Sequence, residues 1–187
     1  NLKTGYQFSF HVLNSDDINA FALPGGPIFI TRGILQKMSN EAELAFILGH
    51  ECGHVVAQHV ARQMTQSSLL NSGLQLASSL GGDNPSTTAQ LSLLGGQFAA
   101  QLYQLRYSRG DESEADTLGV RFMVAAGYDP AGAVDAMQVL DKVGGSSTVE
   151  FFSTHPNPGN RVQALEDQIQ KEFPQAYQNP KYAIYQP

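Results

Sequence analysis

The segment 50–54, with the sequence His-Glu-Cys-Gly-His, constrains this chain more than any other feature. In a helix, positions four apart lie on one face, so His50 and His54 can hold a single metal ion together. Glu51 lies about 100° round the helix from His50, close enough to reach a water beside that metal without binding the metal itself. Two imidazoles and a free carboxylate on one helix are the groups that zinc-dependent peptide hydrolysis requires. The segment therefore predicts a helix that carries part of a zinc site.

The flanking residues favour a helix that is buried. Asn40, followed three residues later by Glu43, has capping-box spacing, and an apolar run begins at Leu44. Gly49 and Gly53 are also four apart. Because glycine destabilises the interior of a helix, we expect these two positions to allow another element to approach closely along that side. A helix that is apolar on nearly every side belongs in a core, where buried histidines need partners. A metal supplies those partners, which argues against a chance pair of surface histidines.

Composition bounds the class of protein. The 187 residues are 42% hydrophobic, enough for a single domain spanning residues 1–187. A net charge of −6 without a Lys/Arg cluster argues against nucleic acid as a partner. There is no apolar run of about 18 residues that could form a transmembrane segment. The chain opens at Asn1 without a visible signal peptide, so we expect its targeting segment to be missing from this sequence. The single cysteine, Cys52, points away from the histidine face and is expected to be a packing residue.

The rest of the chain predicts a small sheet and several more helices. Alternation over residues 6–13 and the apolar segment 27–31 predict strands, and the proline that opens the second suggests an edge position. We expect further helices over residues 33–38, from the acidic segment to residue 126, over 130–143 after an Asp129 cap, and over 159–172. The predicted fold class is α+β, dominated by helices, with a small sheet beside the metal-binding helix.

Residues 65–101 differ in composition from their surroundings. They are rich in Ser, Gln, Gly, Leu and Ala, and Gly81-Gly82-Asp83-Asn84-Pro85 lies in the middle. This pattern predicts two weakly amphipathic helices and a loop. Either the segment is a surface insertion without a function, or it is a mobile lid over the site or a partner-binding surface. The sequence leaves both alternatives open.

A catalytic zinc needs a third protein ligand and an open position for water. The acidic segment 108–116 is the best source of that ligand. Glu112 and Asp116 are four apart, so Glu112 can bind the metal while Asp116 accepts a hydrogen bond from the far nitrogen of a ligating histidine. Glu114 points off that face and is the competing ligand. Arg109 is expected to form a salt bridge with the acidic side chains.

Four blocks of the sequence together resemble the gluzincin family of HtpX-like and CAAX-prenyl-endopeptidase-like metallopeptidases. They are Asn-Ala-Phe-Ala-Leu-Pro-Gly-Gly at 19–26, the His-Glu-Cys-Gly-His motif, Ser108-Arg109 with Glu112 to Asp116, and Ser153-Thr154-His155-Pro156 with Arg161. The resemblance spans residues 19–161 and implies a zincin-like domain with one Zn²⁺ per chain, Glu112 as third ligand and Asp116 as a catalytic-shell residue. The chain lacks the spanning helices of the membrane-embedded members. It therefore looks like the soluble branch found in the bacterial periplasm or cell envelope.

The predicted chemistry is that of a zinc metalloendopeptidase. Glu51 takes the proton of the attacking water and passes it to the leaving amine. The oxyanion that forms needs a donor, for which His155 is the first candidate and Arg161 the second. Alternatively, His155 is a fourth zinc ligand that displaces water and keeps the enzyme inactive. The sequence does not separate these two roles of His155.

Substrate binding is expected at an edge of the sheet, through main-chain hydrogen bonds that ignore sequence. The candidate edge is the segment Asn19, Ala20, Phe21 and Ala22, or Ile28–Thr31 beyond the turn. We expect unfolded or flexible chains to be preferred. His11 lies on the first strand, and His59, five residues after His54, is rotated away from the ligand face, so both are expected to be structural.

Three functions compete at this point. The leading one is a zinc endopeptidase for unfolded or misfolded proteins in envelope protein quality control. The second is a chaperone or assembly adaptor for envelope proteins, working with the envelope assembly machinery and carrying an autoinhibited zinc site, which the segment 65–101 favours. The third is a structural zinc site, which would require His155 to close a shell of four ligands permanently.

Overall fold

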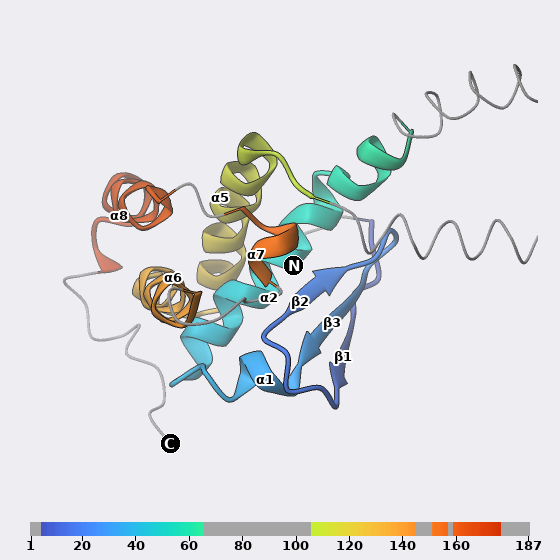
Figure 1. Ribbon diagram of the computed structural model, residues 1–187. Coiled ribbons are helices and arrows are strands. Elements are labelled where there is room, and N and C mark those ends of the chain that lie inside the picture. Colours follow the sequence, from blue (N-terminus) through green and yellow to red (C-terminus); the bar gives the residue numbers. More distant parts are fainter. Residues whose placement is uncertain (1–4, 66–105, 145–150, 157–158, 177–187) are drawn as a thin grey trace, which may run out of the picture.

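The computed structural model describes residues 5–65, 106–144, 151–156 and 159–176. Within these ranges a three-stranded sheet and a set of helices surround one central helix (Figure 1). The strands are β1 (Ser9–Leu13), β2 (Ala20–Ala22) and β3 (Pro27–Thr31), and the helices are α1 (Arg32–Leu35), α2 (Glu41–Val56), α5 (Arg109–Ala125), α6 (Ala131–Gly144), α7 (Phe151–Thr154) and α8 (Arg161–Glu172). The predicted α+β class with dominant helices is confirmed. The segment 65–101 lies, from residue 66 onward, outside the described residues.

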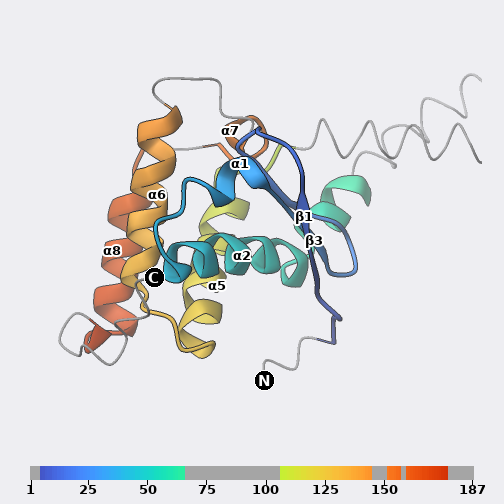
Figure 2. The same cartoon turned by 90° about the horizontal axis from the view of Figure 1, so that it is seen from below.

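Helix α2 lies between the sheet and the other long helices (Figures 1 and 2). It begins at Asn40, whose side chain accepts a hydrogen bond of 3.0 Å from the backbone N–H of Glu43. In the predicted capping box, the Glu43 carboxylate would accept a hydrogen bond from the N–H of Asn40. It accepts one instead from the N–H of the preceding residue, Ser39, at 2.7 Å. Apolar side chains of α2 pack on both sides, against the sheet and in the main core. That core includes Phe46 and Ile47 of α2, Val120 and Met123 of α5, Met137 and Leu140 of α6, and Leu165 and Ile169 of α8.

The sheet has the order β1-β3-β2, with β1 parallel and β2 antiparallel to the central strand β3. The prediction that Pro27 marks an edge strand is therefore wrong. Pro27 is the first residue of β3, where a missing N–H is tolerated, and its carbonyl still accepts a hydrogen bond from Leu23 N. Of the two candidate substrate-binding segments, only Asn19–Ala22 contains an edge strand.

Most predicted elements are present but shorter than expected. The first strand occupies residues 9–13 of the expected 6–13, and the short helix ends at Leu35. Helix α6 begins one residue after Pro130, and the Asp129 carboxylate accepts a hydrogen bond of 2.9 Å from Ala131 N, as expected of a cap. Within the described ranges, none of the helices combines the length and apolar character needed to cross a lipid bilayer.

Helices α2 and α5 meet with their backbones almost in contact. A Cβ atom at Gly49 would lie 2.9 Å from the carbonyl oxygen of Gly119, and one at Gly53 would lie 2.9 Å from that of Ala115. The close approach predicted from the two glycines of α2 is thus confirmed, and α5 is the neighbour. This contact brings the acidic first turns of α5 next to the histidines of α2.

Replacing Gly119 by alanine is expected to lower the free energy of unfolding by about 1–3 kcal/mol, the usual range for overpacking. The added Cβ would lie 2.9 Å from the backbone nitrogen of His50 and 3.1 Å from its Cα, so the two helices must separate. Gly110→Ala in the same helix is the control, because its Cβ would meet only Ser108 Oγ at 3.6 Å. Urea denaturation of both variants measures the effect. Equal stabilities of the two variants would contradict the tight helix contact.

Candidate metal centre

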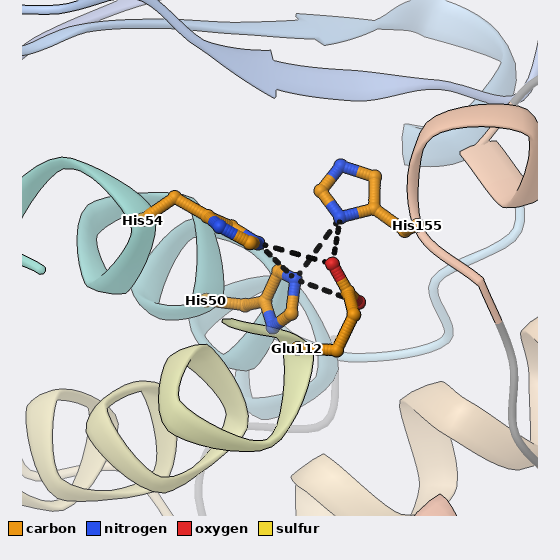
Figure 3. Close-up of side chains that lie close together, drawn as sticks. All are labelled: His50, His54, Glu112 and His155. Atoms are coloured by element: carbon orange, nitrogen blue, oxygen red, sulfur yellow. Dashed lines mark hydrogen bonds and ion pairs between the residues drawn. The ribbon is translucent and has the colours of Figure 1, made fainter. Parts of the chain in front are cut away.

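Four buried side chains from three parts of the chain converge on one point (Figure 3). His50 and His54 come from α2, Glu112 comes from the first turn of α5, and His155 follows α7. Their candidate ligand atoms all lie within 4.8 Å of one another. The Nε2 atoms of His50 and His54 are 3.0 Å apart. Glu112 Oε1 lies 3.4 Å from His54 Nε2 and 2.9 Å from His155 Nδ1.

The start of α5 sets the position of Glu112. Ser108 Oγ accepts a hydrogen bond of 3.1 Å from Asp111 N, and Asp111 Oδ2 accepts one of 3.0 Å from Ser108 N. This reciprocal capping box stabilises the first turn, so Glu112 faces α2 from a rigid helix end. Glu114, the competing ligand, points away: its side chain is half exposed and its carboxylate lies 3.2 Å from His59 Nε2. Among the described residues, Arg109 forms no ion pair with the acidic segment, contrary to expectation.

His155 is held by the short helix α7 and by ring stacking. Its backbone N–H donates to the carbonyl of Phe151 at 2.9 Å, and its ring stacks on the Phe151 ring with centroids 4.4 Å apart. The N–H of Phe151 in turn donates to the carbonyl of Ile18, just before β2. Through these contacts His155 lies next to both the metal-site helices and the edge strand of the sheet.

Asp116 and Arg161 form a second layer behind the cluster. Asp116 Oδ1 lies 2.9 Å from His50 Nδ1, in the position predicted for a carboxylate that accepts a hydrogen bond from a ligating histidine. Arg161 Nε and Nη2 donate to the two oxygens of Asp116 at 2.8 and 2.6 Å, and Arg161 Nη1 lies 2.8 Å from Glu112 Oε2. With the proton of His50 on Nδ1, the lone pair of Nε2 points into the cluster.

The cluster has the properties of a site for a divalent cation. Both carboxylate oxygens of Glu51 are buried without a hydrogen-bond partner among the described residues, and Glu112 Oε2 has an ion pair with Arg161 whose geometry is not that of a hydrogen bond. Burial without a partner is unfavourable for such groups, and ring nitrogens with facing lone pairs gain nothing from each other. Imidazole nitrogens and carboxylate oxygens are the ligands that zinc prefers. The residues therefore fit a zinc ion held by His50, His54 and Glu112.

Burial and charge shift the pKa values of these side chains in different directions. Burial lowers the pKa of His54 well below its usual value, which favours the neutral ring that can bind a metal. Burial would also lower the pKa of His50, but Glu112 and the hydrogen bond to Asp116 outweigh it and raise this pKa. Burial raises the pKa of Glu51 above that of an ordinary carboxyl, as suits a group that takes up a proton.

The metal-free protein is expected to lose stability as the pH falls below the pKa of an unfolded Asp, about 3.9. Burial alone would raise the pKa of Asp116, but the charge of Arg161 and the hydrogen bonds from His50 and Arg161 lower it. A carboxyl with a lowered folded-state pKa stabilises the fold above its unfolded-state pKa, and this contribution is lost as the pH falls through the folded-state value. When urea unfolding is measured in the presence of a chelator, the free energy of unfolding should therefore fall less steeply with decreasing pH in Asp116→Asn than in the wild type. Equal slopes would contradict this.

Two buried residues lie next to His54: His59, which the sequence predicted to turn away from the ligand face, and Tyr107, which the sequence did not single out. His59 is 1% exposed, and its Nδ1 lies 2.8 Å from His54 Nδ1. The expectation that it turns away assumed an unbroken helix, whereas α2 ends at Val56. The ring of Tyr107 stacks on that of His54, with centroids 3.7 Å apart. In the sequence, Tyr107 stands out only as an aromatic residue directly before Ser108, the N-cap of α5.

The expected substrate-binding residues have different environments. Ala20 and Ala22 of β2 are buried, while Phe21 stacks on Phe29 with ring centroids 5.1 Å apart. Asn19 pairs through its backbone with Thr31, and its Oδ1 is buried. Arg161 is only 4% exposed and lies behind the cluster.

His11 also differs from the histidines of the metal site. It is exposed on β1, and its ring stacks on that of Phe29 with centroids 5.0 Å apart. It is not one of the four residues of the cluster, and its structural role stays a prediction.

Comparison with known proteins identifies the family. The model of peptidase family M48 matches residues 2–169. The mitochondrial metalloendopeptidase OMA1 of Arabidopsis thaliana is 36% identical over 163 residues, which cover 86% of this chain and 31% of the relative. The beta-barrel assembly-enhancing protease of Yersinia pestis is 34% identical over 161 residues, covering 83% of this chain and 33% of the relative. Human mitochondrial metalloendopeptidase OMA1 is 35% identical over 163 residues, covering 83% and 31%. The chain thus spans about a third of the length of these relatives.

Proposed function

The chain belongs to peptidase family M48, and on that premise we propose that it is a zinc-dependent endopeptidase domain with a zincin-like fold. The observation that carries this proposal is the convergence of two helix-borne histidines and a carboxylate from a second helix, with Glu51 buried beside them. A buried carboxylate without a hydrogen bond, next to two histidine ligands on one helix, is needed for hydrolysis but has no use in a structural zinc site. We propose residues 1–187 as one catalytic domain of the HtpX-like and CAAX-prenyl-endopeptidase-like kind.

Each residue has a separate part in the proposed mechanism. A zinc ion held by His50, His54 and Glu112 would supply polarisation of the scissile carbonyl and would make the attacking water more acidic. Glu51 takes the proton from the attacking water and delivers it to the leaving amine. Asp116 fixes the ring of His50 by accepting a hydrogen bond from its Nδ1–H group. Arg161 was expected to contact substrate, but its guanidinium lies between two carboxylates, so we propose instead that it positions Asp116 and Glu112.

We propose two alternative roles for His155, and each is supported by the contacts of a different nitrogen of its ring. Nδ1 lies 3.3 Å from His50 Nε2 within the cluster, as a fourth ligand would. Nε2 lies 3.5 Å from Glu51 Oε1, on the side where a donor to the reacting carbonyl would be needed. His155→Ala separates the roles. Higher turnover would contradict the donor role, and lost turnover with zinc still bound would contradict the inhibitory ligand.

Among the described residues, β2 pairs with β3 on one side and is an edge strand on the other, which supports the proposed choice of substrate. Main-chain groups of β2 that do not pair with β3 can pair with an extended peptide, and only an unfolded or flexible chain presents such a segment. We further propose that the protein acts in quality control in the bacterial periplasm or cell envelope, beside the envelope assembly machinery. The name of one relative, beta-barrel assembly-enhancing protease, supports the link to assembly, whereas the OMA1 relatives are named as mitochondrial. The alternative is an assembly adaptor with an autoinhibited zinc site. The position of His155 in the cluster, as a fourth ligand that would displace water, supports this alternative.

Removing the metal is expected to abolish cleavage without unfolding the protein. Casein, as an unstructured substrate, should be cut by the zinc-loaded protein, spared after chelation and cut again when zinc is restored. Circular dichroism should show little change after chelation, because none of the four residues of the cluster belongs to the hydrophobic core. A compact protein should be cut at least about tenfold more slowly than its denatured form, since only the latter can pair with a strand edge. A chelator that melts the fold would indicate a structural zinc site.

A further inference from the structure

We propose that His59 is a positioning residue for the metal centre, which holds His54 in the tautomer that presents Nε2 to the metal. The proposal rests on the zinc site proposed above. His59 Nδ1 lies 2.8 Å from His54 Nδ1, and His54 Nε2 lies 3.0 Å from His50 Nε2 inside the cluster. The ring of His54 therefore lies between His59 and the candidate metal position.

The hydrogen-bond directions of this chain of rings follow from its outer end. His59 Nε2 faces two carboxylates, Glu114 Oε2 at 3.2 Å and Asp111 Oδ1 at 3.4 Å. An ionised carboxylate can only accept, so with one N–H on the His59 ring the proton is on Nε2. The Nδ1 atom of His59 is then an acceptor, and a contact of 2.8 Å requires the proton of His54 on its Nδ1. This leaves the lone pair of His54 Nε2 directed at the cluster.

A break in the helix makes this contact reachable. In a continuous helix, side chains five positions apart differ by about 140° in direction, so His59 would turn away from His54. Helix α2 instead ends at Val56, and Gln58 has a φ of 57°, in the left-handed region that is disfavoured for residues other than glycine. From His59 the chain is helical again to residue 65. Strained backbone of this kind is common beside functional sites.

Both ligating histidines of α2 are thereby connected to carboxylates of α5. His50 Nδ1 contacts Asp116 directly, and His54 Nδ1 contacts Glu114 through His59. Partners of this kind fix the ring orientation and tautomer of a metal-binding histidine. A histidine that only filled space would not need its Nδ1 within hydrogen-bonding distance of the Nδ1 of a ligand.

Zinc affinity of the full chain, measured by competition with a chromophoric chelator, tests the proposal. His59→Leu and His59→Asn have nearly the same shape, but only Asn places an oxygen close to the position of Nδ1. We expect His59→Leu to bind zinc about 10–100-fold more weakly and His59→Asn to lose less than about fivefold. Val60→Ala is the matched control, because Val60 is the next residue, is 3% exposed and is not one of the four cluster residues. It should lower stability and leave zinc affinity unchanged.

The outcomes separate this proposal from the zinc site itself. Wild-type affinity in His59→Leu, or equal losses in His59→Leu and His59→Asn, would overturn the role of His59. If His59→Leu does not fold, the tautomer of His54 can be read in the wild type from long-range ¹H–¹⁵N correlations of the imidazole rings. A proton on His54 Nδ1 is expected, and one on Nε2 would overturn the proposal. A wild type that binds no zinc, or His54→Ala that binds it normally, would instead contradict the metal centre.

Discussion

Glu51→Gln is expected to lower kcat/KM for peptide hydrolysis by about 10²–10⁴-fold while zinc stays bound, because glutamine cannot take up the proton of the attacking water. Both Glu51 oxygens are buried without hydrogen-bond partners among the described residues, so the amide disrupts no observed hydrogen bond. Removing a buried charge that burial itself disfavours should also leave the fold at least as stable. Casein cleavage, metal content and thermal denaturation, measured on the same preparations, test these three statements together.

The control for this variant is Glu41→Gln. Glu41 lies in the first turn of the same helix and is exposed, so the same chemical change there should leave hydrolysis unaffected. Retention of more than about a tenth of wild-type activity in Glu51→Gln would contradict its role as general base, for which the usual loss is larger. Loss of zinc together with activity would mean that Glu51 helps to hold the metal.

Helix α2, which carries His50 and His54, could be predicted from sequence because the residues that identify it are close together in the chain. The spacing of His50 and His54 fixes their common face, and the same rule places Glu112 and Asp116 together on α5. The meeting of these two faces is not local, but the glycines of α2 indicated that a neighbour would approach closely. Gly119 of α5 completes that contact, which explains why the side chains predicted as ligands lie together.

The parts that sequence did not predict depend on single backbone conformations or on long-range pairing. The direction of His59 is set by the φ of Gln58, and nothing about a glutamine indicates a left-handed conformation. The central place of β3 is set by its pairing with both β1 and β2, whereas Pro27 alone suggested an edge. The place of Arg161 depends on α8 packing against α5, a contact between residues far apart in the chain.

The second large effect is expected for Glu112→Gln, which should weaken zinc binding by at least about 100-fold and abolish hydrolysis. Glu112 is the one carboxylate in the four-residue cluster, and a neutral amide is a poorer zinc ligand than a carboxylate. Arg161 Nη1, 2.8 Å from Glu112 Oε2, would also lose a charged partner in a buried position. Breaking a buried ion pair from one side lowers the free energy of unfolding by roughly 3 kcal/mol.

Chelator competition and urea denaturation measure the two effects of Glu112→Gln separately. Glu114→Gln is the matched control, since Glu114 is the competing ligand in the sequence, is two residues away on the same helix, and is half exposed beside His59 and Arg62. Asp111 shares its contact with His59, so zinc affinity in Glu114→Gln should change by less than about threefold. The assignment of the third ligand would be reversed if Glu114→Gln lost zinc and Glu112→Gln kept it. If neither variant lost zinc, the metal would have to be held by the histidines alone, which would leave the position of Glu112 Oε1, 3.4 Å from His54 Nε2, without an explanation.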